Sequence, residues 1–105
     1  MSEVITSAEF KAKVLESPIP VIVDFFATWC MPCKMLAPIL ESVAAEAGGS
    51  FKIVKIDIDK EPALTNQYDI QTVPTLVFIK GGKMVDQIVG VMPKPVIMEK
   101  VRALG

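Results

Sequence analysis

The clearest change of hydrophobic pattern along the chain falls in its first half. Residues 21–27 are apolar except for Asp24, and the run is short and rich in β-branched and aromatic side chains, which favours a buried strand. From Cys33 onward the apolar positions recur at intervals of one and three residues, as on one face of a helix. These positions are Leu36, Ile39, Leu40, Val43, Ala44 and Ala47. We therefore predict a buried strand that runs directly into a helix.

Local signals mark where the helices of the first half begin and end. Gly48-Gly49 is a stop signal just after the predicted helix, and Pro38 inside it removes a hydrogen bond, so we expect a kink there. Thr6 and Glu9 have the spacing of a capping box, which predicts an earlier helix starting near Thr6. The proline-containing segment 17–20 ends that helix and leads into the strand over 21–27.

The second half of the chain predicts one more strand, a short helix, a hairpin and a final helix. Residues 51–58 are strongly apolar, and residues 62–68 read as a short helix with a proline at an early position. The apolar runs 76–79 and 84–89 flank Gly81-Gly82, which signals a tight hairpin. After a proline-rich break at 93–95, an amphipathic helix closes the chain, outlined by Val96, Ile97, Val101 and Leu104.

The order of these elements predicts the fold class. With a strand ahead of the first helix, the order is βαβαβ, then a short helix, then ββα, which gives five strands and four helices. The first part implies parallel strands joined by crossover helices, and the hairpin adds antiparallel strands. We therefore predict an α/β fold with a central mixed five-stranded sheet flanked by four helices, in three layers.

Composition narrows the classes of protein that fit. The 105 residues, about half of them hydrophobic, predict one domain over 1–105, and the net charge of −1 with no basic block argues against nucleic-acid binding. No apolar run reaches 18 residues, so we expect no membrane span. The first residues lack a basic segment followed by a long apolar one, so we expect no signal peptide and a cytoplasmic location.

The chain has two cysteines, Cys30 and Cys33, where the predicted strand ends and the helix begins. Free backbone N–H groups and the positive end of a helix dipole favour a thiolate at such a place, and the spacing allows a small disulfide ring. A redox role is the first interpretation. The alternatives are a structural disulfide or half of a metal site, although with no histidine a metal would need carboxylates or a second chain. We expect no metal.

The residues around the cysteines, Trp29-Cys30-Met31-Pro32-Cys33-Lys34, resemble the thioredoxin family. The likeness covers essentially the whole chain, including the segments 23–25, 37–40, 57–59 and 73–76. It implies a thioredoxin-like fold and a protein-disulfide reductase. Cys30, nearer the solvent, attacks the substrate disulfide, and the more buried Cys33 then attacks Cys30 to release the product.

The resemblance also implies roles for two charged residues. Asp24 interrupts an apolar strand, so its carboxyl group has a shifted pKa or a hydrogen-bond partner. It matches the family's buried aspartate, which takes the proton from Cys33, and Lys55 matches the lysine paired with it. The alternatives are a solvent-facing or sheet-edge Asp24 and an ordinary solvated Lys55.

Pro74 stands at the front of an apolar strand, where it could be a plain strand-start proline. The resemblance instead implies a cis-proline packed against the cysteines, with the backbone of Val73 offered to an extended substrate. An apolar docking rim then surrounds Cys30, although Trp29 and Met31 have alternatives as packing residues. The rim consists of Trp29, Met31, Pro32, Val73, Gly90 and Val91. The remaining methionines, Met35 among them, read as core or surface filler.

Three positions depart from the commonest family pattern: Met31 replaces a glycine, Phe26 a tryptophan, and Thr72 a small residue. Met31 matters most because residues between the cysteines tune the redox balance and contact the partner. We expect no bound cofactor, electrons from NADPH through a thioredoxin reductase, disulfide-containing protein substrates and a monomer. The rival interpretations are an oxidant or isomerase on the same fold, and a non-redox binding or chaperone-like subunit.

Overall fold

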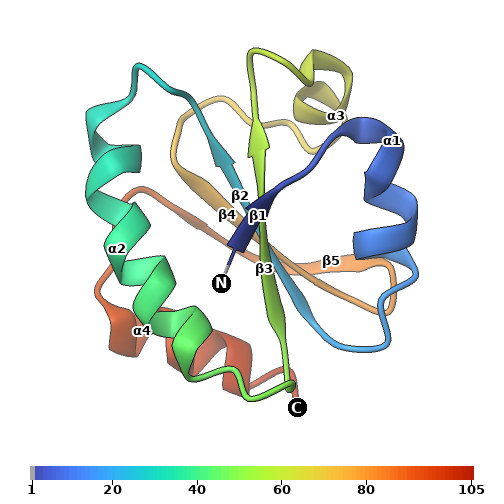
Figure 1. The fold of residues 1–105 in the computed structure, drawn as a ribbon, viewed down its shortest axis with the longest axis vertical. Coiled ribbons are helices and arrows are strands. Elements are labelled where there is room, and N and C mark those ends of the chain that lie inside the picture. The colour runs from blue at the N-terminus through green and yellow to red at the C-terminus, as the bar shows by residue number, and fades with distance from the viewer. Residues whose placement is uncertain (1) are drawn as a thin grey trace.

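A mixed five-stranded sheet forms the centre of the molecule (Figure 1). The computed structural model describes residues 2–105. The strand order is β1-β3-β2-β4-β5, with β1, β3 and β2 parallel and with β4 antiparallel to both β2 and β5. The strands are β1 (Ser2–Val4), β2 (Val21–Phe26), β3 (Lys52–Asp57), β4 (Thr75–Lys80) and β5 (Lys83–Val89). The predicted fold class is therefore confirmed.

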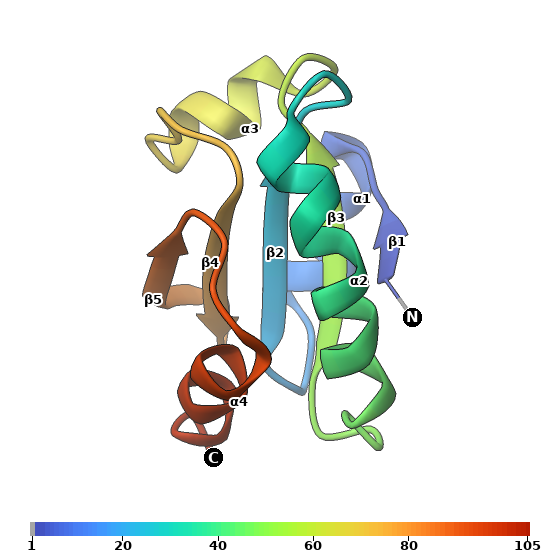
Figure 2. The same cartoon turned by 90° about the vertical axis from the view of Figure 1, so that its left-hand side faces the viewer.

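Helices cover both faces of this sheet and complete the three layers (Figure 2). Helices α2 and α4 lie on one face, and α1, which continues into the π-helical segment η1, lies on the other with α3. The helices are α1 (Ser7–Phe10), η1 (Lys11–Leu15), α2 (Met31–Ala45), α3 (Pro62–Gln67) and α4 (Lys94–Arg102). No helix within residues 2–105 is long and apolar enough to cross a membrane.

Two hydrophobic clusters, one on each face, meet in the central strand β2. Because side chains alternate along a strand, Val21, Val23 and Phe25 pack beneath α1, η1 and α3, whereas Ile22 packs beneath α2 and α4. The alternation places Asp24 on the same side as Ile22. A central strand covered on both faces has no polar side, which explains why residues 21–27 show no regular polar positions.

The predicted local signals act as expected, with small shifts in boundaries. Thr6 and Glu9 form the capping box of α1. Gly81 and Gly82 join β4 to β5 with φ values of 61° and 80°, the left-handed backbone that a two-residue hairpin of this kind requires. The final helix differs from the prediction: it begins at Lys94, because a proline such as Pro95 fits the first turn of a helix, where no N–H is needed. Pro38 lies inside α2, and the kink stays a prediction.

Candidate active site

A disulfide joins Cys30 and Cys33, whose Cα atoms lie 5.3 Å apart. Cys30 is the N-cap of α2, and its Sγ accepts a hydrogen bond from the backbone N–H of Cys33 at 3.2 Å. Pro32 follows in the first turn, where its fixed φ suits a helix start. This one N–H of the first turn of α2 therefore points at the sulfur of Cys30, and a donor at a helix N-terminus favours a thiolate there once the disulfide opens.

The expected difference in burial between the two cysteines is not present, and this part of the prediction is wrong. Cys30 is 4% exposed and Cys33 is 6% exposed. Both pack in a small cluster with Ala27, against the partly buried Phe26 and Val73. The loop carrying Val73 covers Cys30, and a residue's place at a helix tip does not reveal such a cover.

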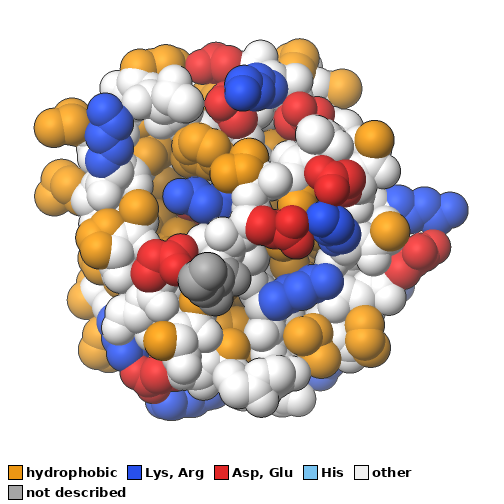
Figure 3. Space-filling view, viewed as in Figure 1, with side chains coloured by type: hydrophobic (Ala, Val, Ile, Leu, Met, Phe, Trp, Pro, Cys, Tyr) orange, Lys and Arg blue, Asp and Glu red, His pale blue; other side chains and the backbone are white. Residues whose placement is uncertain are grey.

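What differs between the two sulfurs is their surroundings. The Sγ of Cys30 lies 3.7 Å from the carbonyl oxygen of Val73, the residue expected to pair with substrate. Cys33 lines a hollow of about 260 Å³ between α2 and the strands, shared with Lys34 and Lys55. Figure 3 shows a hollow with hydrophobic walls on this side of the molecule. The sulfur of Cys30 thus borders the loop that carries Val73, whereas Cys33 borders a hollow that it shares with Lys55.

Asp24 and Lys55 are neighbours because β2 and β3 pair in a register that sets them side by side. The Lys55 Nζ lies 3.9 Å from Oδ2 of Asp24 and 5.0 Å from the centre of the Phe26 ring. Asp24 is 1% exposed, and its Oδ1 has no hydrogen-bond partner within residues 2–105. Burial raises the pKa of Asp24 to about 6, and the nearby charge of Lys55 acts in the opposite direction.

The Val73–Pro74 peptide bond is cis, and Pro74 is buried next to the cysteine loop. The Pro74 carbonyl accepts a hydrogen bond of 2.8 Å from the N–H of Gly90, which joins two segments expected in the docking rim. Val91, the next residue, is half-buried and packs against the core beneath α2 and α4.

The exposed part of the expected rim lies at the start of α2. Trp29 is 66% exposed and Met31 is 67% exposed, so neither acts as a core packing residue. Pro32 is exposed beside them, and Val73 is half-buried. In Figure 3, hydrophobic side chains project from the surface over the beginning of α2. Apolar surface of this kind, next to a disulfide, suits contact with a protein partner.

The sequence did not single out Asp59 for the site. Its Oδ2 accepts a 2.8 Å hydrogen bond from the indole N–H of Trp29, and its own N–H donates to the carboxylate of the buried Asp57. This chain of contacts holds the indole ring while leaving it exposed. Trp29 and Val73 also line a second hollow, of about 280 Å³, with Ile58, Ile70, Gln71 and Thr72.

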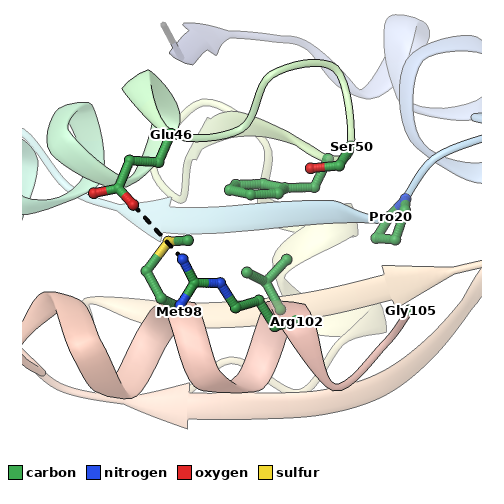
Figure 4. A pocket seen from close by; sticks show the side chains of 8 residues that line it. Pro20, Glu46, Ser50, Met98, Arg102 and Gly105 are labelled. Carbon is green, nitrogen blue, oxygen red and sulfur yellow. Dashed lines mark ion pairs between the residues drawn. The ribbon is translucent and has the colours of Figure 1, made fainter.

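Another cavity, of about 220 Å³, lies beside helix α4 and the end of α2 (Figure 4). Its floor includes Phe51 and Met98, and at its rim Arg102 lies 3.7 Å from Glu46. Glu46 is also paired with Lys94, so both its charge and that of Arg102 have partners. Neither the cysteines nor Asp24 line this cavity.

Two thiols that can form and open a disulfide beside an apolar surface are the working parts of thiol–disulfide exchange, which makes the protein a thiol–disulfide oxidoreductase. Comparison with known families gives the narrower assignment. The protein-family model for thioredoxin matches residues 1–103, and the chain belongs to the thioredoxin family.

Curated relatives agree over most of the chain. It is 43% identical to thioredoxin 1 of Nostoc sp., covering 90% of this chain and 89% of the relative. It is 47% identical to thioredoxin 1 of Synechococcus elongatus, covering 86% and 84%. It is also 43% identical to the chloroplastic thioredoxin M4 of Arabidopsis thaliana, covering 86% and 47%. The protein accordingly reduces disulfides of protein substrates by exchange with its Cys30–Cys33 pair.

Proposed function

We propose that the two cysteines divide the exchange reaction between them. The thiolate of Cys30 attacks one sulfur of the substrate disulfide, forming a mixed disulfide and releasing the first substrate thiolate. Cys33 then loses its proton and attacks the Sγ of Cys30, releasing the second thiolate. The substrate gains two electrons, and the protein is left with the Cys30–Cys33 disulfide. The observation that carries this assignment is that Cys30 borders Val73, whereas Cys33 borders the hollow shared with Lys55.

Asp24 takes the proton of Cys33 in this scheme. A general base works best with a pKa near the operating pH, and burial raises the pKa of Asp24 to about 6. At pH 7 the carboxylate is therefore mostly ionised but still basic enough to accept a proton. Lys55, 3.9 Å from the carboxylate, favours the ionised form. Cys33 and Lys55 both line one hollow, and water in it would link Cys33 to the lysine that lies beside Asp24.

Substrate docks on the rim formed by Trp29, Met31, Pro32, Val73, Gly90 and Val91. The exposed side chains at the start of α2 supply apolar contact, and Asp59 fixes the orientation of the indole of Trp29. The half-buried Val73, which precedes cis-Pro74, offers its backbone to an extended substrate segment. Docking also orients the substrate, because the attacking sulfur of Cys30 must line up with the two sulfurs of the substrate disulfide.

Electrons reach the Cys30–Cys33 disulfide from NADPH through a thioredoxin reductase, which makes the protein an electron carrier between that enzyme and its substrates. We propose that it acts as a cytoplasmic monomer formed by one domain over residues 1–105, without a bound cofactor. Support for these points comes from the family membership and from the match to relatives along most of their length.

The role of Asp24 is tested by replacing it with alanine. Release of product from the preformed mixed disulfide should slow several-fold in Asp24→Ala between pH 6 and pH 8, because Cys33 then lacks its base, while the first attack by Cys30 keeps its rate. Stopped-flow fluorescence of Trp29 separates the two steps. Asp86→Ala is the matched control, since Asp86 is paired with Lys100 and lies outside the site. A release rate that is unchanged over this pH range would remove Asp24 from the mechanism.

A further inference from the structure

Two methionines stand out on the surface next to the disulfide. Met31 is 67% exposed and Met35 is 63% exposed, and they lie four residues apart on one face of α2, where side chains are neighbours. Met84, in the hairpin strand β5, is 49% exposed, and Met98, in α4, is only 4% exposed. These four thioethers, among the six methionines of the sequence, form a graded series of exposure.

The thioethers are the exposed oxidisable sulfur atoms when the cysteines are joined. In the disulfide form neither Cys30 nor Cys33 has a thiolate, and both are at most 6% exposed. A methionine thioether needs no deprotonation to react. With hydrogen peroxide it accepts one oxygen atom, the O–O bond breaks and water leaves; the sulfur is oxidised by two electrons to the sulfoxide and the peroxide is reduced. Exposed methionines react in preference to buried ones.

A sulfoxide at the first residue after Cys30 would change the docking surface. The sulfoxide group is polar and strongly hydrated, so bringing it against an apolar partner costs the desolvation that a thioether does not need. Met35 lies one helical turn, about 6 Å, farther from the cysteine at the helix tip. Oxidation there should affect docking less.

We propose that Met31 is a site of peroxide modification whose sulfoxide weakens docking of protein disulfides while leaving the Cys30–Cys33 chemistry intact. This inference rests on the docking rim proposed above. A methionine at position 31, unlike a glycine, can be oxidised. The protein's activity toward protein substrates therefore falls when peroxide is abundant.

The test begins with the purified disulfide form and dilute hydrogen peroxide. Peptide mass spectrometry over time should show Met31 and Met35 gaining one oxygen first, Met84 later and Met98 last. After removal of the peroxide, kcat/KM for a protein disulfide should fall on the order of threefold to tenfold, as expected when one apolar docking contact becomes polar. The rate with a small aromatic disulfide, which needs no docking surface, should not change.

Two leucine variants assign the effect to one methionine. Leucine has a similar volume and cannot form a sulfoxide. Met31→Leu should keep its activity toward the protein substrate through peroxide treatment, whereas Met35→Leu should lose it as the unmodified sequence does. If Met31→Leu loses as much activity as the natural sequence, or if Met98 is oxidised as fast as Met31, the proposal is wrong.

A glutamine variant separates this proposal from the docking rim on which it rests. Met31→Gln places a polar side chain of similar length at the rim without any peroxide. If Met31→Gln leaves the KM for protein disulfides unchanged, the rim itself is wrongly placed and the proposal falls with it. If Met31→Gln raises that KM but peroxide does not modify Met31, the rim stands and the modification site is wrong.

Discussion

Asp24 shows most clearly how one residue sets both chemistry and stability. It lies in the central strand, 1% exposed, with Lys55 at 3.9 Å and with Oδ1 lacking a hydrogen-bond partner within residues 2–105. Burying a carboxylate with so little compensation costs free energy, which is why its pKa rises to about 6. A strongly perturbed carboxyl group, paired with a lysine that shares a hollow with a cysteine, is typical of an active site.

The same pKa predicts how the stability of the disulfide form depends on pH. Asp24 binds its proton more tightly in the folded state than in the unfolded state, where the pKa is about 3.9, so the free energy of unfolding falls as pH rises from about 4 to about 6. Asparagine does not titrate. Asp24→Asn should therefore gain stability relative to the natural protein by about 2 kcal/mol between pH 4 and pH 7.5. Urea unfolding of the disulfide form at the two pH values measures this gain.

Asp86→Asn provides a control of opposite sign. The hydrogen bond from Lys100 lowers the pKa of Asp86, so this group stabilises the fold above the unfolded-state pKa and loses that effect as pH falls. Its variant should become slightly less stable relative to the natural protein as pH rises. A stability difference for Asp24→Asn that stays constant from pH 4 to pH 7.5 would contradict the raised pKa.

At the scale of elements, the hairpin between β4 and β5 depends on its two glycines in different ways. Both have positive φ, 61° at Gly81 and 80° at Gly82. A Cβ at Gly81 would meet nothing within 4 Å, whereas a Cβ at Gly82 would lie 3.1 Å from the carbonyl oxygen of Leu15 in η1. A side chain at either position would strain the turn, and a side chain at Gly82 would also press against η1.

This difference predicts an order of effects. Gly81→Ala should destabilise the protein by about 1 kcal/mol, the cost of placing a side chain in the left-handed region. Gly82→Ala should cost about 1 kcal/mol more, because Leu15 and the hairpin must move apart. Urea unfolding of the two variants gives the comparison directly. Equal destabilisation would show that the contact between the hairpin and η1 is loose.

Elements were predictable where their signals are local. Thr6 and Glu9 form the expected capping box, and Gly81-Gly82 forms the expected turn, because each depends only on neighbouring residues. The start of α4 differs from the prediction because the prolines at 93–95 do not exclude a helix: Pro95 lies in the first turn, where a proline is compatible with a helix.

The site was predictable only in part, because some of its contacts join residues that are far apart in the sequence. The polar interruption at Asp24 and the spacing of the two cysteines are visible in the sequence. The equal burial of Cys30 and Cys33 depends on a loop more than 40 residues away, and the hydrogen bond from Trp29 to Asp59 depends on how two turns meet. Such contacts arise from tertiary packing, which no local pattern reveals.

At the scale of the whole molecule, the two hydrophobic clusters share one sheet. Strand β2 contributes Ile22 to one cluster and Val23 to the other, so neither cluster can come apart without exposing the central strand. We therefore expect the disulfide form to unfold in one cooperative transition. Fluorescence of Trp29 and far-UV circular dichroism should give the same urea midpoint. Two separate midpoints would mean that parts of the chain unfold independently and that residues 1–105 are not one cooperative domain.

The division of labour between the cysteines is the central claim, and trapping the mixed disulfide tests it most directly. Reduced Cys33→Ser, incubated with a disulfide-bonded protein, should accumulate a stable adduct through Cys30, because the second attack is blocked. Intact mass and peptide mapping identify the adduct. Reduced Cys30→Ser should form little or none, since Cys33 borders the hollow and not the docking loop. An adduct that forms equally well through Cys33 would contradict the assigned roles, and the absence of any adduct would favour a binding protein without redox turnover.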